Sequence, residues 1–398
     1  MSDAIETTMT ARKQRIIFID VIRAFAILMM LQGHFIDAML LPEYRDYGLP
    51  LYAFWAFFRG LTAPIFFFST GLVFMYLLLK DERPILQNER VHKGLRRVGM
   101  LVGIGYVLKW SLPSLLRLHF YPSFFLVDVL HCIGFAILGL IIVYALHRWL
   151  QFSLRVILFT LAIIIFLSNP ILKAADWSVL PPWLANYFTT AYGSTFTLFP
   201  WIGYTFIGGV LGVWLNRNKT MAFAAWFPWA LVALGWALHA FSTHWMAALY
   251  EITAWNTFYE ITRNNYLLMR LGHVLITVAA VVWITRWWKT MPSIVTKIGS
   301  ETLTIYAVHY VILYGTWFNF GLVSLWKQQL QPMQAALGAL LFVISFIIIT
   351  AHIEAIRLLL YRQLPAMAYY AFRVVRIKII RFYLRARRPV RRIWLSFT

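Results

Sequence analysis

The segment FIDVIRAFAILMMLQGHFIDAML, residues 18–40, is long and apolar enough to cross a lipid bilayer as a helix, which takes about 17 to 25 residues. It nevertheless carries Asp20, Arg23, His34 and Asp37. Charged and titratable side chains are costly in hydrocarbon, and they usually face the interior of a helix bundle or a water-filled cavity. The segment therefore predicts a first membrane helix with a polar face.

The composition extends this interpretation to the whole chain. Of the 398 residues, 61% are hydrophobic and 13% are charged, whereas soluble domains carry about 25% charged residues. Long apolar runs recur, and the alternating segments of about ten residues that are typical of outer-membrane barrels are absent. We expect an all-α protein, a polytopic transmembrane helix bundle of about ten spans. The expected spans are 17–40, 52–79, 95–113, 124–147, 153–171, 196–215, 221–242, 267–288, 302–326 and 334–360.

The distribution of basic residues predicts the orientation. If the N-terminus is cytoplasmic, basic residues on the cytoplasmic side outnumber those outside by roughly three to one, as the positive-inside rule expects. Both termini are then cytoplasmic. The predicted organisation is a cytoplasmic N-terminal segment 1–16, a transmembrane domain 17–360 and a basic cytoplasmic tail 361–398. The first apolar run is too long and too charged for a cleaved signal peptide, so we expect a multi-pass protein of the cytoplasmic (inner) membrane.

The net charge of +21 raises the question of nucleic-acid binding. The basic residues lie between apolar runs and in RVVRIKIIRFYLRARRPVRRIW (373–394), where they anchor the chain and favour anionic lipid. We therefore expect membrane lipid, and no nucleic acid, as a partner. Cys132 is the single cysteine and no HExxH spacing occurs, so we expect neither a disulfide framework nor a bound metal.

The polar residues of the first span form a stripe. Asp20, Arg23 and His34 fall within about 60° of one another around the helix, and Arg23 and His34 are about 16 Å apart along its axis. A buried ion pair and a hydrogen-bonded core histidine would also explain the stripe. A histidine at its deep end favours function instead, which makes His34 the main catalytic candidate. Asp20, which we expect to orient Arg23, and Asp37 are further catalytic candidates. Asp37 either orients His34 or marks the helix end.

Basic residues also gather at the start of the third span, where Lys93, Arg96 and Arg97 lie at its cytoplasmic mouth. The positive-inside rule alone would explain them. The alternative is a phosphate-binding site, because arginine forks and the backbone donors of helix ends suit such anions.

Three later segments bring polar or small residues onto one helix face. Asp128 and His131 are three apart, and the carboxylate could orient the imidazole or make an interface hydrogen bond. Tyr306 and His309 share a face in the ninth span. These four are candidates for substrate binding or structural support. The glycines of GYTFIGGVLG (203–212) predict close helix packing.

The first membrane segment resembles the opening of the acyltransferase-3 family of integral-membrane acyltransferases. In RIIFIDVIRAFAILMMLQGHF (15–35), Arg15, Asp20, Arg23 and His34 stand at the positions of that family's Arg, Asp-x-x-Arg and His.

Other segments extend the resemblance over residues 15–310. APIFFFSTGL (63–72) is similar to the second-span F-F-x-x-S-G segment of that family. The stretch 299–309 is similar to its late S-x-x-x-x-Y-x-x-H segment, with looser spacing. DVLHCIGFAIL (128–138) and LFPWIGYTFIGGVLG (198–212) are closer to bacterial relatives of the lysosomal heparan-α-glucosaminide N-acetyltransferase.

The resemblance implies transfer of an acyl group, here expected to be acetyl, from cytoplasmic acyl-CoA to an amine or hydroxyl of a sugar or glycolipid outside. It implies a catalytic role for His34 and binding of the CoA phosphates by arginines, here Arg23, Arg96 and Arg97, with Lys93 beside them. The basic cluster reads KGLRRVG rather than R-x-x-R. His34 would act as a general base or accept the acyl group covalently. A homodimer is compatible with this assignment.

Two other function classes remain open. A proton-coupled transporter could use the stripe of Asp20, Arg23 and His34 as its relay, although no inverted repeat is visible. A non-catalytic scaffold or lipid-binding protein would tolerate substitution of Arg23 and His34 together.

Overall fold

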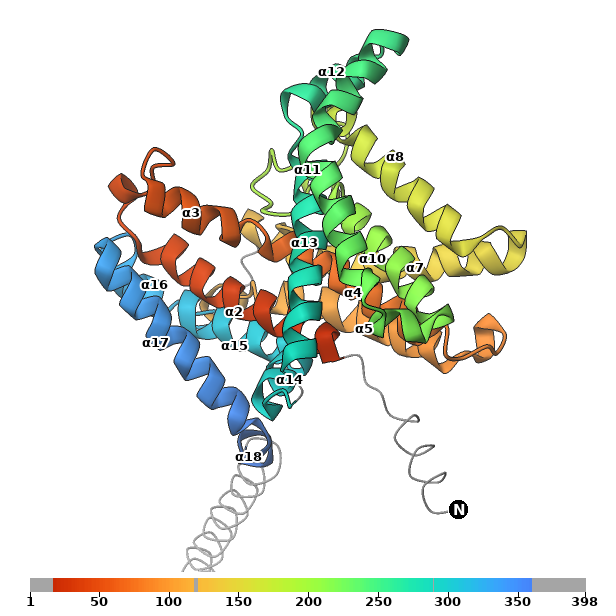
Figure 1. The fold of residues 1–398 in the computed structure, drawn as a ribbon. Coiled ribbons are helices and arrows are strands. Elements are labelled where there is room, and N and C mark those ends of the chain that lie inside the picture. Colours follow the sequence, from red (N-terminus) through yellow and green to blue (C-terminus); the bar gives the residue numbers. More distant parts are fainter. Residues whose placement is uncertain (1–16, 118–120, 289, 360–398) are drawn as a thin grey trace, which may run out of the picture. The chain divides into compact units, whose positions relative to one another are not determined.

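The computed structural model describes residues 17–117, 121–288 and 290–359, and within these ranges the chain is helical with no β-strand (Figure 1). The expected N-terminal segment 1–16, with Arg15, and the basic tail 361–398 lie outside the described residues. Residues up to Ile344 belong to one compact unit, and a second unit begins at Ser345. The helices are α2 (Ile17–Met39), α3 (Pro50–Arg59), α4 (Thr62–Leu78), α5 (Glu89–Val107), α6 (Leu112–Leu116), α7 (Val129–Leu150), α8 (Leu154–Ala174), α9 (Pro182–Ala185), α10 (Trp201–Arg217), α11 (Trp226–Thr253), α12 (Asn256–Arg263), α13 (Tyr266–Trp287), α14 (Ser293–Ser300), α15 (Thr302–Tyr314), α16 (Leu322–Trp326), α17 (Pro332–Ala351) and α18 (Ile353–Leu358).

Six helical segments of the described chain are long and apolar enough to cross a membrane, which confirms an all-helical membrane protein. The expectation of about ten spans, and the side on which each terminus lies, stay predictions. The six segments are Ile17–Met39, Pro50–Leu78, Pro122–Leu150, Leu154–Ala174, Tyr266–Trp287 and Pro332–Ala351.

One expected span is shorter in the structure. The region 302–326 contains α15, which ends at Tyr314, because Gly315 takes a left-handed φ of 70° and closes the helix on the carbonyl of Val311. Thirteen residues rise about 20 Å, less than the roughly 30 Å of a bilayer core. α15 is therefore a half-length helix beside α2.

The closest helix contact joins α4 and α10. A Cβ atom on Gly71 would lie 1.8 Å from the carbonyl oxygen of Thr205, and one on Gly208 would lie 1.9 Å from that of Phe68. No side chain fits at such separations, so the two backbones touch directly. This confirms the close packing predicted from the glycines of the sixth span.

A second close contact brings the late part of the chain onto the first helix. Gly299 of α14 packs against the backbone of Asp20, where a Cβ would lie 2.1 Å from the carbonyl oxygen. α15 follows directly and lies along α2 (Figure 1). Side chains nearly 300 residues apart thereby reach one another.

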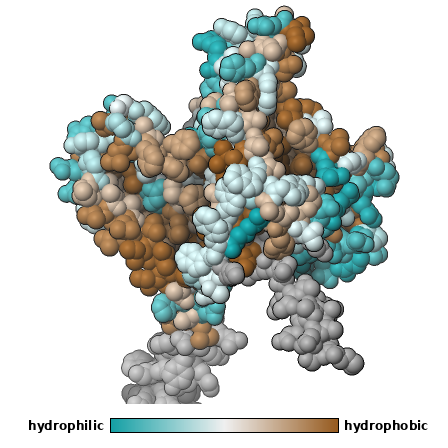
Figure 2. All heavy atoms as spheres, viewed as in Figure 1, coloured by the Kyte–Doolittle hydropathy of each residue, from teal (hydrophilic) through white to brown (hydrophobic). Residues whose placement is uncertain are grey.

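The surface is rich in large apolar side chains, and Figure 2 shows broad hydrophobic areas on the face in view. On α11, Trp229, Trp236, Phe241 and Trp245 are all exposed. Apolar side chains on this scale are stable in contact with lipid rather than water.

Candidate active site

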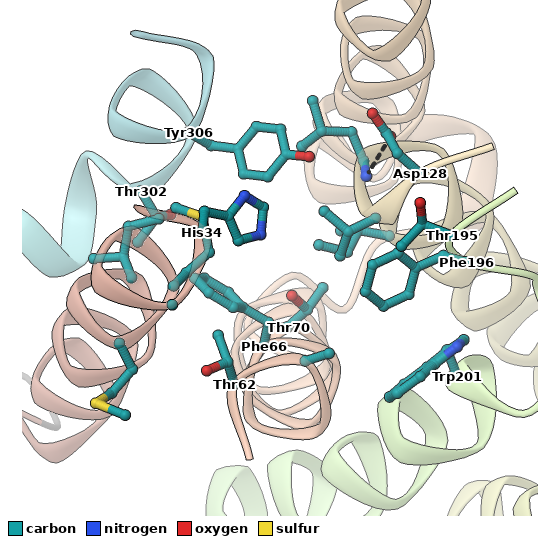
Figure 3. Close-up of a pocket in the computed structure, with 18 of the residues that line it drawn as sticks. His34, Thr62, Phe66, Thr70, Asp128, Thr195, Phe196, Trp201, Thr302 and Tyr306 are labelled. Carbon is teal, nitrogen blue, oxygen red and sulfur yellow. Dashed lines mark hydrogen bonds between the residues drawn. The ribbon is translucent and has the colours of Figure 1, made fainter. Parts of the chain in front are cut away.

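A cavity of about 530 Å³ lies beside α2, within the usual size range of small-molecule sites. Its wall follows α2 from Arg23 to Asp37, which is about 21 Å along the helix axis. The other walls come from α4, α5, α7, α13, α15 and the stretch before α10. Figure 3 shows His34 and Tyr306 on one side of this cavity and Asp128, Thr195 and Phe196 across from them.

Two arginines lie on the cavity wall toward the N-terminal end of α2. Arg23 donates a hydrogen bond of 2.9 Å from Nη2 to the hydroxyl of Thr302, the first residue of α15. Arg97 of α5 also lines the cavity. Together they supply positive charge at one end of an otherwise mostly apolar space.

The other two predicted cations of α5 do not line this cavity. Arg96 is exposed, and the Lys93 ammonium lies 3.3 Å from the carboxylate of Glu89, one turn earlier. Successive residues on a helix point about 100° apart, so Arg96 and Arg97 cannot share one direction. Of the four predicted cations, Arg23 and Arg97 line the cavity, whereas Lys93 and Arg96 do not.

His34 lies farther along the cavity wall and meets α15. Its Nδ1 atom is 3.3 Å from Nε2 of His309 and 3.3 Å from the hydroxyl of Tyr314. His309 is fully buried, and its Nδ1 has no hydrogen-bond partner in the described part of the chain. Tyr306 and Tyr310 of α15 line the same wall. The predicted Tyr306–His309 face is therefore the one turned toward His34.

Asp37 forms an ion pair with Arg59, the last residue of α3, and both line the cavity. The structure therefore gives Asp37 a partner other than His34. It also lies two residues before α2 ends at Met39. Asp20 is buried where α14 packs on α2, and it does not line the cavity. Of the two aspartates, Asp37 is the one that lines the cavity.

Asp128 caps the N-terminus of α7 and is 6% exposed. Its Oδ1 accepts a hydrogen bond of 3.0 Å from the backbone N–H of Leu130 and lies 2.8 Å from Nδ1 of His131. The expected pairing of Asp128 with His131 is present in the structure. Asp128 lines the cavity, whereas His131 does not. His131 is fully buried, and its ring centroid lies 4.3 Å from that of Tyr106.

Several residues that line the cavity were not predicted from the sequence. Thr62, Phe66 and Thr70 come from α4, and the hydroxyl of Thr62 is buried without a hydrogen-bond partner among the described residues. Threonines within an otherwise apolar span are the sequence feature that could have identified the two residues Thr62 and Thr70. Thr195, Phe196 and Trp201 come from the segment before and at the start of α10, where no periodic pattern marks an inward direction. They complete the wall around Asp128 (Figure 3).

In the described ranges, no group of three or more His, Cys, Asp or Glu side chains is placed to hold a metal ion. The titratable side chains that line the cavity include His34, tyrosines, carboxylates and arginines.

Comparison with known protein families gives a match over residues 15–246 to the catalytic domain of heparan-alpha-glucosaminide N-acetyltransferase. The matched region contains His34, Asp37, Arg97 and Asp128, and α15 lies beyond it. Comparisons with curated proteins and with solved structures found no match. Since the match covers more than half of the chain, the protein belongs to the family of the heparan-alpha-glucosaminide N-acetyltransferase catalytic domain, a family of membrane acetyltransferases.

Proposed function

We propose that this protein moves an acetyl group from cytoplasmic acetyl-CoA to an amine or hydroxyl of a sugar or glycolipid on the outer side of the cytoplasmic membrane. The observation that supports it best is the cavity along α2, which has Arg23 and Arg97 on its wall at one end, Asp37 and Arg59 at the other, and His34 in between. A reaction with its donor on one side of the membrane and its acceptor on the other needs a cavity that extends between the two. The family's description, which names a glucosaminide N-acetyltransferase, favours an amino sugar as acceptor.

In this proposal the donor enters at the arginine end. CoA is a long thin molecule with an anionic head, and guanidinium groups bind phosphate through charge-assisted, often paired hydrogen bonds. Arg97 and Arg23 would hold the head while the pantetheine arm follows α2 toward His34. The rise between Arg23 and His34, about 16 Å, suits an extended arm better than a compact ligand.

His34 is the proposed general base. An imidazole has an ordinary pKa close to the working pH and is the commonest catalytic base. The Nδ1 side of His34 faces His309 and Tyr314, which leaves its other nitrogen for the acceptor. A covalent acetyl-histidine on the same nitrogen is the alternative route.

The test is transfer of radiolabelled acetyl from acetyl-CoA to extracted membrane glycans by the purified full-length chain. His34→Ala should abolish transfer while CoA binding, measured by calorimetry, persists. Undiminished transfer by that variant would remove His34 from the mechanism. Solute uptake by vesicles without acyl-CoA, and no CoA binding, would instead favour a proton-coupled transporter that uses Asp20, Arg23 and His34. Crosslinking in membranes would test the expected homodimer.

A further inference from the structure

The Asp128 carboxylate has one oxygen in use and one that is not. Oδ1 accepts hydrogen bonds from the backbone N–H groups of Leu130 and His131 and lies within hydrogen-bond distance of the His131 ring. Oδ2 is buried and has no hydrogen-bond partner in the part of the chain that the structure describes. Asp128 lines the cavity and its side chain is 8% exposed, so this carboxylate has hydrogen-bonding capacity beside the cavity that no described residue takes up.

The helix-capping role of Asp128 does not account for Oδ2. An N-cap needs one side-chain oxygen, and asparagine or serine caps as well as aspartate does. A carboxylate at this position costs free energy that a neutral cap would avoid, because an ionised group in a low-dielectric interior needs a paired charge. Among the described residues, the ring of His131 is the basic group that contacts this carboxylate, and it does so through Oδ1, so Oδ2 is left for another partner.

Two nearby basic groups, Lys109 and Arg59, have hydrogen-bond or ion-pair partners other than Oδ2 of Asp128. Lys109 is close enough to interact electrostatically with Asp128, but its ammonium donates to the carbonyl of Leu126 and it does not line the cavity. Arg59 is paired with Asp37. Neither of these two cations pairs with Oδ2, so the hydrogen-bonding capacity of this oxygen is left for a ligand of the cavity.

We propose that Oδ2 of Asp128 binds the reacting nitrogen of the acceptor as an ammonium ion, so that this residue selects an amine over a hydroxyl. The inference rests on the proposed function and deepens it. Asp128 stands across the cavity from His34, as Figure 3 shows, so a nitrogen between them faces both groups. The unpartnered hydroxyl of Thr62 and the hydroxyl of Thr195 supply neutral hydrogen-bonding groups on the same cavity for the rest of a polyhydroxylated acceptor.

The reaction balances with these groups. His34 takes one proton from the bound ammonium, and the free amine attacks the thioester carbonyl of acetyl-CoA. The C–N bond forms, the tetrahedral intermediate loses a second proton, and the C–S bond breaks. One of the two protons goes to the CoA sulfur and the other to solvent, which leaves the amide and free CoA thiol. Asp128 accepts a hydrogen bond from the nitrogen as ammonium, as free amine and in the tetrahedral intermediate, and it loses its charged partner when the neutral amide forms.

The test compares two probes that differ in one group, glucosamine and glucose, with acetyl-CoA and the purified full-length chain. The variants are Asp128→Asn and Asp128→Ser, which keep a helix cap and remove the charge. The control is Asp176→Asn, which alters an exposed carboxylate that does not line the cavity. Wild type and the control should favour glucosamine over glucose by about 100-fold in kcat/KM. Both Asp128 variants should lose at least about 30-fold on glucosamine, mainly in KM, as expected for removing one partner of a buried charge pair.

Each outcome decides the inference. Wild-type enzyme that acetylates both sugars equally, or neither, overturns the assignment of an amine to Asp128. So does an Asp128 variant that binds CoA and still acetylates glucosamine at the wild-type rate. Loss of the proposed function is a different result: wild type would then fail to transfer acetyl to any membrane glycan, whatever residue occupies position 128.

Discussion

His34 and His309 lie with their ring nitrogens 3.3 Å apart, although 275 residues separate them in the sequence. Their rings meet edge to face, with centroids 5.1 Å apart. Since His309 is fully buried, it holds a fixed position against which the ring of His34 is oriented. The match to the acetyltransferase family ends at residue 246, so the second histidine comes from outside the matched region.

His309→Ala is predicted to lower kcat by about 100-fold, because a general base without its orienting partner loses the geometry of proton transfer. KM for acetyl-CoA should change little, since the arginine end of the cavity is untouched. Tyr314→Phe removes the other neighbour of His34 Nδ1 and should cost less, because Tyr314 is 38% exposed. Steady-state release of CoA thiol measures kcat and KM for both variants.

His147→Ala is the matched control for that prediction, because His147 bonds the carbonyl of Phe152 and does not line the cavity. It should behave as wild type. A His309→Ala enzyme with wild-type kcat and pH profile would show that the contact with His34 only packs the two helices.

Arg97→Gln is predicted to weaken the binding of acetyl-CoA by about 10- to 100-fold, the usual loss for one hydrogen bond to a charged group. Arg96→Gln should change affinity by less than about twofold, because Arg96 does not line the cavity, although both side chains are exposed. The two variants remove the same charge from adjacent positions of α5, so general electrostatics affects both alike. Calorimetric titration with CoA distinguishes them, and equal losses would contradict a site at Arg97.

The sequence predicts the parts of this molecule that depend on local order. Hydropathy and length identify α2 and the other long spans, because each helix satisfies its own backbone hydrogen bonds in a bilayer. The pairing of Asp128 with His131 follows from their spacing of three. The close contact of α10 follows from its glycines, because small residues let helix backbones approach.

The rest depends on which helices are neighbours. Nothing in the periodicity of α2 indicates that Thr302 receives a hydrogen bond from Arg23, or that His309 reaches His34. Both contacts follow from the packing of α14 and α15 on α2, which a single sequence does not encode locally. The same holds for Arg96 and Arg97, whose separation by about 100° is predictable while the direction of the cavity is not.

Asp81→Asn is predicted to lower the thermal stability of the connection between α4 and α5 in a pH-dependent way. The Asp81 carboxylate accepts hydrogen bonds from Arg83 and from the backbone of Glu89, and the Arg83 guanidinium lowers its pKa to about 2. Because the folded-state pKa is below the ordinary value, the carboxylate stabilises the fold above about pH 4, and this contribution disappears as pH falls toward 2. The difference in Tm between wild type and variant, followed by tryptophan fluorescence, should therefore shrink between pH 6 and pH 3. A difference that is constant with pH would show that Asp81 acts only through its shape.

Gly208→Ala is predicted to destabilise the whole bundle, because a Cβ there would lie 1.9 Å from the carbonyl oxygen of Phe68 and only a shift of the α4 or α10 backbone can relieve it. Overpacking of this kind costs about 3 kcal/mol, and backbone on both sides makes it costlier than crowding of flexible side chains. Gly103→Ala is the matched control, since a Cβ at Gly103 of α5 meets no atom within 4 Å and alanine favours a helix by up to about 1 kcal/mol. Cys132 is the single cysteine of the chain and is fully buried, so its reaction with a thiol dye on heating reports unfolding directly. The Gly208 variant should expose this thiol at a lower temperature than wild type and the Gly103 variant should not, whereas equal melting of the two would mean that α4 and α10 do not touch through their backbones.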